Sequence, residues 1–300
     1  IHLAADQMQK TAGQVIAGEQ LNVILGTEPI EGEGSDLVKL NIMKFLNEKY
    51  GIVESDFLSA ELNIVPAGKC REVGLDRSLI SAYGHDDRVC SFAGLMALID
   101  AAEGKTPEVT ASILMCDKEE IGSMGSTGMQ SSFFENTVAE FIERQEKDAR
   151  DIMVRRALER SSMLSADVTA AFDPHFPDVN STGNCAYLHK GPAASKYTGG
   201  TSKGGSSDCG PEFVAEIRKI MDEGGVTWQM AELGKMEKGG GGTISQYMAR
   251  FGMDVLDMGT GLWNKAEARG LVQNILLRIT PGIDPHTHKA VVTGSVDSKF

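Results

Sequence analysis

Acidic residues stand at three separate places where they could do chemistry together. The stretch ILMCDKEEIGSMGSTGMQ carries an apolar run into Glu119 and Glu120 and then continues with glycines and serines. Asp86 and Asp87 come directly before a helical pattern, and Asp167 interrupts the apolar run LSADVTAAF. Open α/β sheets place their ligands at the carboxyl ends of the strands, where such side chains would gather. The spacing therefore indicates a group of carboxylates at one sheet edge.

Each acidic position also has an ordinary structural interpretation. Glu119 and Glu120 fit a polar turn after a strand, and Asp86 or Asp87 fits a helix N-cap, which contributes about 1 kcal/mol. Several carboxylates at one edge, however, repel one another unless a cation neutralises them. Metal-activated hydrolases use this arrangement. Carboxylates and imidazoles hold the metal, the metal lowers the pKa of a bound water to about 7, and another carboxylate takes the proton.

The pattern of predicted helices and strands changes along the chain and indicates two domains. Residues 35–51 combine a Ser-Asp start, apolar residues at helical spacing and a terminal glycine, which predicts an amphipathic helix. Residues 59–68 alternate like a half-buried strand. We interpret residues 1–78 as a small α+β domain and residues 79–300 as a larger one.

Strand and helix patterns alternate in the second part. We expect strands over 109–116, 226–233 and 253–259, and helices over 88–104, 132–145, 148–163, 211–223 and after Thr243. Such alternation predicts an α/β fold with a mostly parallel sheet and helices on both faces. The glycine run 239–242 lacks the phosphate-loop pattern and is interpreted as a flexible active-site loop that opens a helix.

Composition excludes several other classes of protein. The chain has 300 residues, 41% of them hydrophobic, and a net charge of −13, which argues against nucleic-acid or anionic membrane surfaces. Its five cysteines have no C-x-x-C spacing, which favours reduced thiols in the cytoplasm. No apolar run reaches the roughly 18 residues of a membrane span. The chain begins at Ile1 within an apparent element, so we interpret it as a fragment.

Long blocks of the sequence resemble the M18 metallo-aminopeptidases, in particular the bacterial members of the aspartyl aminopeptidase and aminopeptidase I group. The blocks include GLDRSLISAYGHDDRVCSF, DKEEIGSMGSTGMQS, LSADVTAAFDPHFPD and WQMAELGKMEKGGGGTI. They cover residues 1 to about 260, whereas the C-terminal 40 residues do not match. The resemblance implies a zinc-exopeptidase-like fold with a small dimerisation domain, the N-terminal part of the catalytic domain being absent.

The resemblance also assigns roles to the acidic residues. Asp86 matches a carboxylate that bridges two divalent metal ions, Glu120 a ligand of one ion, and Asp167 a ligand of the other. Glu119 matches the general base. The implied ions are zinc, with manganese or cobalt as alternatives. The implied reaction is hydrolysis of the N-terminal residue of peptides by a metal-activated water.

Two further residues take roles from the resemblance. His2 matches a histidine that enters the active site of a neighbouring subunit, and Lys196 lies in a segment that lines the substrate pocket. Surface positions without a function are the alternative for both. A homo-oligomer based on dimers, up to a dodecamer, is implied.

Two histidine ligands of the family are not evident in their places. One belongs to an upstream His-x-Asp motif and the other to a Met-His-Ser motif after the strand at 253–259. His286 and His288 are the histidines of the unmatched tail and are candidate replacements. Two alternatives therefore stay open: a catalytically degenerate oligomeric scaffold of the same fold, and a related metal-dependent deacylase or carboxypeptidase.

Overall fold

A computed structural model describes residues 2, 4–104, 106–200, 202, 204–205, 208–262 and 275–276. The chain divides into two compact units, Ile1–Val65 and Pro66–Phe300. The domain boundary predicted after residue 78 falls within a hairpin of the second unit, in which β1 (Arg71–Val73) pairs antiparallel with β2 (Leu79–Ser81). The assignment of the first unit to dimerisation stays a prediction.

The first unit is built around helix α1 (Leu37–Tyr50). This helix confirms the prediction for residues 35–51: it ends at Gly51, which has φ 72° and donates its N–H to the carbonyl of Asn47, as a left-handed C-cap does. Short 3-10 turns accompany it at Gln7–Gln9, Ala12–Gln14, Gly18–Gln20 and Glu54–Leu58. The strand predicted over 59–68 is wrong, because the described residues of this unit supply no neighbouring strand for it.

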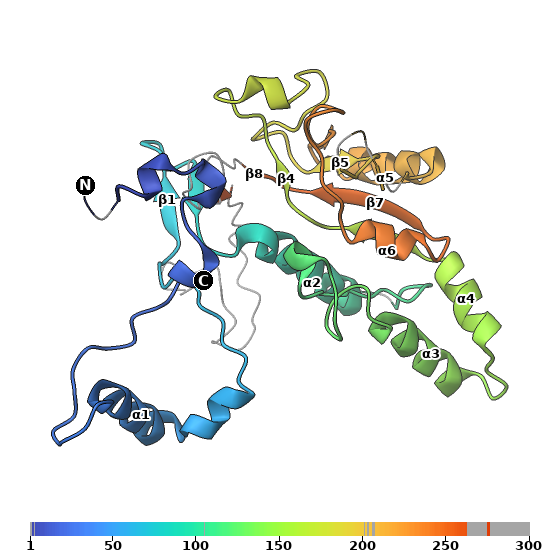
Figure 1. Cartoon of the computed structure of the whole chain (residues 1–300). Helices are drawn as coiled ribbons and strands as arrows, with labels where there is room; N and C mark the ends of the chain where they lie inside the picture. Colours follow the sequence, from blue (N-terminus) through green and yellow to red (C-terminus); the bar gives the residue numbers. More distant parts are fainter. Residues whose placement is uncertain are drawn as a thin grey trace. The chain divides into compact units, whose positions relative to one another are not determined.

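A four-stranded sheet forms the centre of the second unit (Figure 1). Its order is β3 (Ser162–Ser165), β7 (Asp254–Gly259), β5 (Ala193–Ser195) and β6 (Gln229–Met230). β3 runs parallel to β7 and β5 parallel to β6, whereas β5 and β7 are antiparallel. The predicted α/β class is confirmed, with a mixed sheet.

Two smaller sheets accompany the central one. β4 (Thr169–Ala170) pairs parallel with β8 (Gly261–Leu262), and β9 (Ile275–Leu276) adds to the β1–β2 hairpin. The helices of this unit are α2 (His85–Glu103), α3 (Phe133–Gln145), α4 (Asp151–Glu159), α5 (Pro211–Glu223) and α6 (Ser245–Ala249). None of the helices described is both long and apolar enough to cross a membrane.

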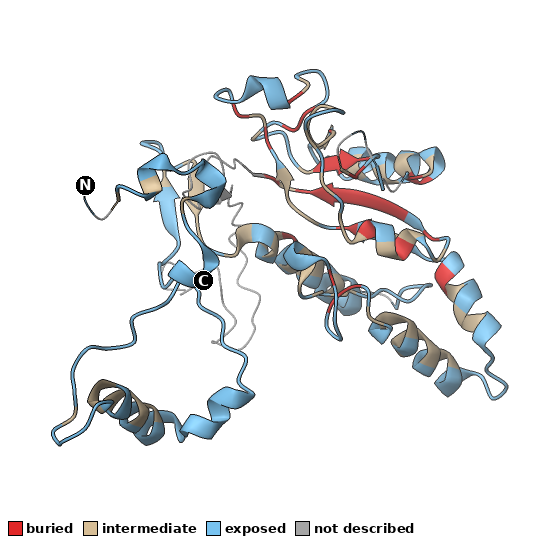
Figure 2. Cartoon of the chain, viewed as in Figure 1, coloured by how far each residue is buried: buried red, intermediate tan, exposed pale blue. Residues whose placement is uncertain are grey.

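Strand β7 carries the core, and helices cover both of its faces (Figures 1 and 2). Alternate side chains of a strand point to opposite faces. Val255 joins a cluster with Leu158 of α4 and Met248 of α6, whereas Leu256 joins Phe213 of α5 on the other face. Leu256 is fully buried. The buried apolar strand predicted at 253–259 is thus confirmed, with helices on both sides.

Other predicted elements differ from the structure. The expected strand 109–116 has no strand pairing among the described residues, and only Asp117 forms a bridge, to Gly128. The helix expected over 148–163 ends at Glu159 because Ser162 already pairs with β7. The strand expected over 226–233 is reduced to β6. In each case the pairing available in the tertiary structure, and not local hydrophobicity, sets the element's length.

Candidate metal centre

Asp86 and Asp87 precede the regular part of helix α2. Both residues have non-helical backbone angles, and the peptide bond between them is cis. Asp87 Oδ1 accepts the backbone N–H of Cys90 at 3.4 Å, which is the contact that an N-cap makes. The charge of Glu120 acts on the carboxyl group of Asp86. Asp87 therefore caps the helix, and both aspartates lie near the glutamates, since the charge of Asp87 acts on Glu119 and that of Glu120 acts on Asp86.

A tight turn presents Glu119 and Glu120. The turn spans Glu119–Ile121 and is flanked by Lys118 and Gly122, both with positive φ. The carbonyl oxygen of Lys118 accepts the N–H of Ser123 at 2.7 Å, and Ser123 is buried.

The backbone of Gly128 packs closely against the backbone of Ser123 at the end of this turn. A Cβ atom at Gly128 would lie 2.2 Å from the carbonyl oxygen of Ser123, so only glycine fits there. The side chain of Gln130 donates to the carbonyl of Gly122 at 2.8 Å. The glycines and serines that follow the glutamates in the sequence therefore serve to hold the turn in one conformation.

Asp167 lies in the break between β3 and β4, as its interruption of an apolar run predicts. Its Oδ1 accepts the backbone N–H of Val168 at 2.7 Å. Its backbone packs against the last residue of β7, because a Cβ atom at Gly259 would lie 1.2 Å from the carbonyl oxygen of Asp167. The absence of a side chain at Gly259 thus decides where this carboxylate stands.

The three segments bring their carboxylates together. Asp86, Asp87 and Asp167 each offer an oxygen atom, and these atoms lie within 4.8 Å of one another. The charge of Glu120 acts on Asp86, and the charge of Glu119 acts on both Asp86 and Asp167. Sequence reasoning left Asp87 out of the site; its place beside Asp86 was the signal that could have included it.

The carboxyl groups of this cluster have pKa values raised above those of free carboxyl groups. Burial, followed by the charge of Glu120, raises the pKa of Asp86 to about 6. Burial and then the charge of Asp86 raise the pKa of Asp167 to about 7. Burial is also the main cause that raises the pKa values of Asp87 and Glu119. These pKa values are raised because the carboxylates are partly desolvated and have no compensating positive charge nearby. A bound divalent cation would supply that charge and lower the pKa values again.

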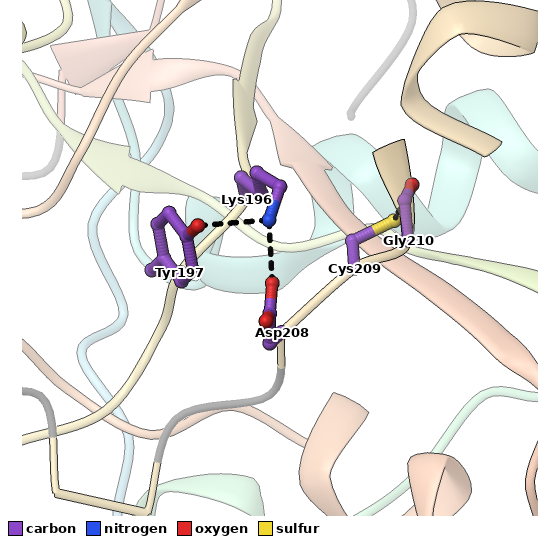
Figure 3. Close-up of polar contacts among 5 residues, drawn as sticks. All are labelled: Lys196, Tyr197, Asp208, Cys209 and Gly210. Carbon is purple, nitrogen blue, oxygen red and sulfur yellow. Dashed lines mark hydrogen bonds and ion pairs between the residues drawn. The ribbon is translucent and has the colours of Figure 1, made fainter. Parts of the chain in front are cut away.

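The ammonium group of Lys196 contacts Asp208 and Tyr197 (Figure 3). Its Nζ donates to Asp208 Oδ1 at 2.5 Å and to the hydroxyl of Tyr197 at 2.9 Å, and it lies 4.1 Å from the centre of the Tyr197 ring. The hydrogen bond with Asp208 is the main cause that raises the pKa of Lys196. An acidic ligand would have to compete with Asp208 for this ammonium group.

His2 is exposed and belongs to the first unit, whereas His286 and His288 lie outside the described residues.

The backbone of the glycine run 239–242 packs against the backbone at Gly199 and Gly200. Gly199 donates its N–H to Gly241 at 2.8 Å, and a Cβ atom at Gly240 would lie 2.4 Å from the carbonyl of Gly199. Close contact between two backbones accounts for glycine at this position; a role of the loop in the active site stays a prediction.

Comparison with known proteins shows the family of this chain. A model of the family described as aminopeptidase I zinc metalloprotease (M18) matches residues 1–274. The chain belongs to the M18 family. A probable M18 family aminopeptidase 1 from Clostridium acetobutylicum is 50% identical over 265 residues, which are 88% of this chain and 56% of that protein. The corresponding protein of Thermotoga maritima is 44% identical over 257 residues, 86% of this chain and 56% of that protein.

Solved M18 structures share the fold. The M18 aminopeptidase of Thermotoga maritima superposes with a TM-score of 0.82 at 41% identity, covering 90% of this chain and 58% of that one. Aminopeptidase I of Clostridium acetobutylicum superposes with a TM-score of 0.75 at 48% identity, covering 92% and 58%. The chain thus spans little more than half the length of the relatives that it matches.

Proposed function

We propose that this chain carries the carboxylate half of a metallo-aminopeptidase site that removes the N-terminal residue of peptides. One observation carries the proposal: Asp86 and Asp87 at the start of α2 and Asp167 in the β3–β4 break offer carboxylate oxygens within 4.8 Å of one another, and the charges of Glu119 and Glu120 in the neighbouring turn act on Asp86. Carboxylates gathered in this way destabilise the folded protein by desolvation and mutual repulsion, and a polar turn with a purely structural role does not require them.

The donor set fits divalent cations. Carboxylate oxygens bind zinc, manganese and magnesium, although zinc sites in enzymes typically include three protein ligands with imidazole among them. The described cluster offers oxygen donors only. We therefore propose two divalent ions, with zinc as the family's metal and manganese or cobalt as alternatives, and imidazole ligands from outside the described cluster.

The proposed roles follow the arrangement of the carboxylates. Asp86 is proposed to bridge the two ions, because the charge of Glu120 acts on it and its carboxylate shares the 4.8 Å group with Asp167. Glu120 would hold one ion and Asp167 the other. Ions bound in this way supply Lewis acidity toward the scissile carbonyl and a more acidic water.

Glu119 is proposed as the general base. Its turn holds it next to Glu120, and its raised pKa brings it closer to neutral pH, where a base is most effective. It would take a proton from the attacking water and deliver it to the leaving amine. Lys196 is proposed to line the substrate pocket with its counter-ion Asp208, and His2 to act across a subunit interface in a dimer-based homo-oligomer in the cytoplasm.

The decisive experiment exchanges the two neighbouring glutamates separately. Glu119→Gln should keep both metal ions and lower kcat by about 10²–10⁴-fold, the usual size of a general acid–base contribution. Glu120→Gln should lose metal. Glu140→Gln, on the exposed surface of α3, is the control and should change neither property.

Metal content measured by mass spectrometry and a peptide assay give the answer. If Glu119→Gln loses metal while Glu120→Gln keeps metal and rate, the roles are reversed. A scaffold would bind little metal and cleave nothing. Cleavage of N-acetylated peptides at a rate similar to that of free peptides would favour the deacylase or carboxypeptidase.

A further inference from the structure

A buried carboxylate that the proposed reaction does not use lies in the middle of the central sheet. Asp257 of β7 is only 6% exposed. It is in register with Ser165 of β3 on one side and with Ser195 of β5 on the other. Burial of a carboxylate destabilises the fold unless hydrogen bonds compensate it, so the partners of Asp257 indicate what this residue does.

Thr243 and Ser245 connect Asp257 to the start of helix α6. The hydroxyl of Thr243 donates to Asp257 Oδ1 at 2.5 Å. Thr243 Oγ1 also lies 2.5 Å from Ser245 Oγ and accepts the backbone N–H of Ser245 at 3.2 Å. Because Thr243 gives its one hydroxyl proton to Asp257, the hydroxyl of Ser245 is the donor in the contact between the two side chains. The hydrogen bonds therefore run in one direction, from Ser245 through Thr243 to Asp257.

Asp257 lies on β7 shortly before the point where this strand supports Asp167. Val255, Asp257 and Gly259 are two residues apart and so belong to the same face of the sheet. Val255 packs in one cluster with Met248, which shows that α6 covers this face (Figure 1). At Gly259 the backbone of β7 is in close contact with the carbonyl of Asp167. Two residues of a strand span about 7 Å, so the contact with Asp167 is close to the Asp257 carboxylate.

The pairing of β3 with β7 ends at Asp257. Ser165 and Asp257 form the last pair of this parallel ladder. Two residues further along both segments, Asp167 and Gly259 are in contact through their backbones. Pairing of the two segments resumes at Thr169 in β4. The hydrogen bonds of the Asp257 side chain thus hold the last strand pair before the chain departs toward Asp167.

We propose that Asp257 is a positioning residue of the metal centre: its hydrogen bond with Thr243 ties the end of β7 to the start of α6 and thereby fixes where the Asp167 carboxylate stands. The inference rests on the proposed function, which makes Asp167 a metal ligand. Asp257 acts through the backbone of β7 and not as a ligand. Removal of groups that orient ligands in this way typically weakens metal binding by about 10–100-fold.

The metal-free chain gives the first measurement. The N–H of Val168 donates to Asp167 Oδ1 at 2.7 Å, so hydrogen exchange of this amide, followed by NMR, reports whether the carboxylate is held in place. Thr243→Val keeps the volume of the side chain and removes the hydroxyl, and we expect the Val168 amide to exchange at least about 10-fold faster. Thr243→Ser retains the hydroxyl and should exchange within about 2-fold of the wild type.

Calorimetric titration with Mn²⁺ measures the consequence for the metal. Thr243→Val and Asp257→Ala should each weaken binding by at least about 10-fold. The double variant should bind no more weakly than Asp257→Ala, because both substitutions remove the same hydrogen bond. Ser165→Ala and Thr137→Val are the controls, since Ser165 Oγ has no hydrogen-bond partner among the described residues and the hydroxyl of Thr137 donates within α3. Both controls should bind Mn²⁺ within about 2-fold of the wild type.

Thermal unfolding in EDTA separates positioning from a general loss of stability. A lower Tm of Thr243→Val with unchanged Val168 exchange and unchanged Mn²⁺ affinity would mean a purely structural role and would overturn the proposal. Equal effects of Thr243→Val and Thr243→Ser would overturn it as well. If the wild-type chain binds no Mn²⁺, the proposed function fails separately, and the exchange of Val168 then decides: faster exchange in Thr243→Val that Thr243→Ser avoids supports the positioning of Asp167, and unchanged exchange refutes it.

Discussion

Asp167→Asn should stabilise the metal-free chain at alkaline pH. The substitution removes one negative charge from the carboxylate cluster, and the asparagine oxygen can still accept the N–H of Val168, which Asp167 Oδ1 accepts at 2.7 Å. Because the pKa of Asp167 is raised from 3.8 to about 7 in the folded protein, the folded state binds the proton more tightly than the unfolded state. Stability of the wild type therefore falls as pH rises from about 4 to about 7, and the deficit is complete above that range.

The size of the effect follows from the same shift. At about 1.36 kcal/mol for each pKa unit, the difference corresponds to roughly 4 kcal/mol as an upper bound. The side chain is partly exposed and titrates together with Asp86, so screening and coupling reduce this to about 1–2 kcal/mol. For a unit of this size we expect the Tm of Asp167→Asn at pH 8 to rise by about 2–8 °C in EDTA. At pH 4 the two proteins should melt within about 1 °C of each other.

Thermal unfolding in EDTA and with added zinc or manganese measures both sides of the prediction. Metal should stabilise the wild type and should stabilise Asp167→Asn much less, because a ligand is lost. Asp100→Asn, on the exposed surface of α2, is the control and should show neither effect. The reasoning is refuted if Asp167→Asn destabilises the metal-free protein equally at pH 4 and pH 8, since the aspartate would then act through its packing and not its charge.

The structure leads to three further predictions. Gly259→Ala should push away the backbone of Asp167, which lies 1.2 Å from the new Cβ position, and lower metal affinity by more than about 10-fold, whereas Gly183→Ala, with no atom within 4 Å, should leave metal titrations unchanged. With oxygen donors only, calorimetry should show weak zinc binding and a relative preference for manganese or magnesium; tight binding of two zinc ions would mean that histidines outside the described cluster act as ligands. If His2 acts across an interface, mixed oligomers of His2→Ala and Glu119→Gln chains should recover activity that neither variant has alone, and verified mixed oligomers without recovery would exclude a shared site.

Several elements of this protein and the acidic residues of its candidate site could be predicted from local features of the sequence. Helices α1, α3 and α5 and the buried strand β7 follow from apolar periodicity and from end signals such as Gly51, because these features depend on neighbours a few residues away. Family membership follows from long blocks of matching residues. The two adjacent glutamates and the aspartate that interrupts an apolar run were visible for the same reason, since their spacing is unusual without a function.

Tertiary contacts decided what spacing alone could not. The sequence does not tell which of Asp86 and Asp87 caps the helix; backbone geometry at the start of α2 gives that contact to Asp87. Asp167 reaches the cluster because Gly259, distant in the sequence, leaves room for its backbone. Residues 109–116 have a strand's composition but pair with no strand in the described part of the chain. A strand exists only where another strand offers hydrogen bonds, and local sequence does not encode that neighbour.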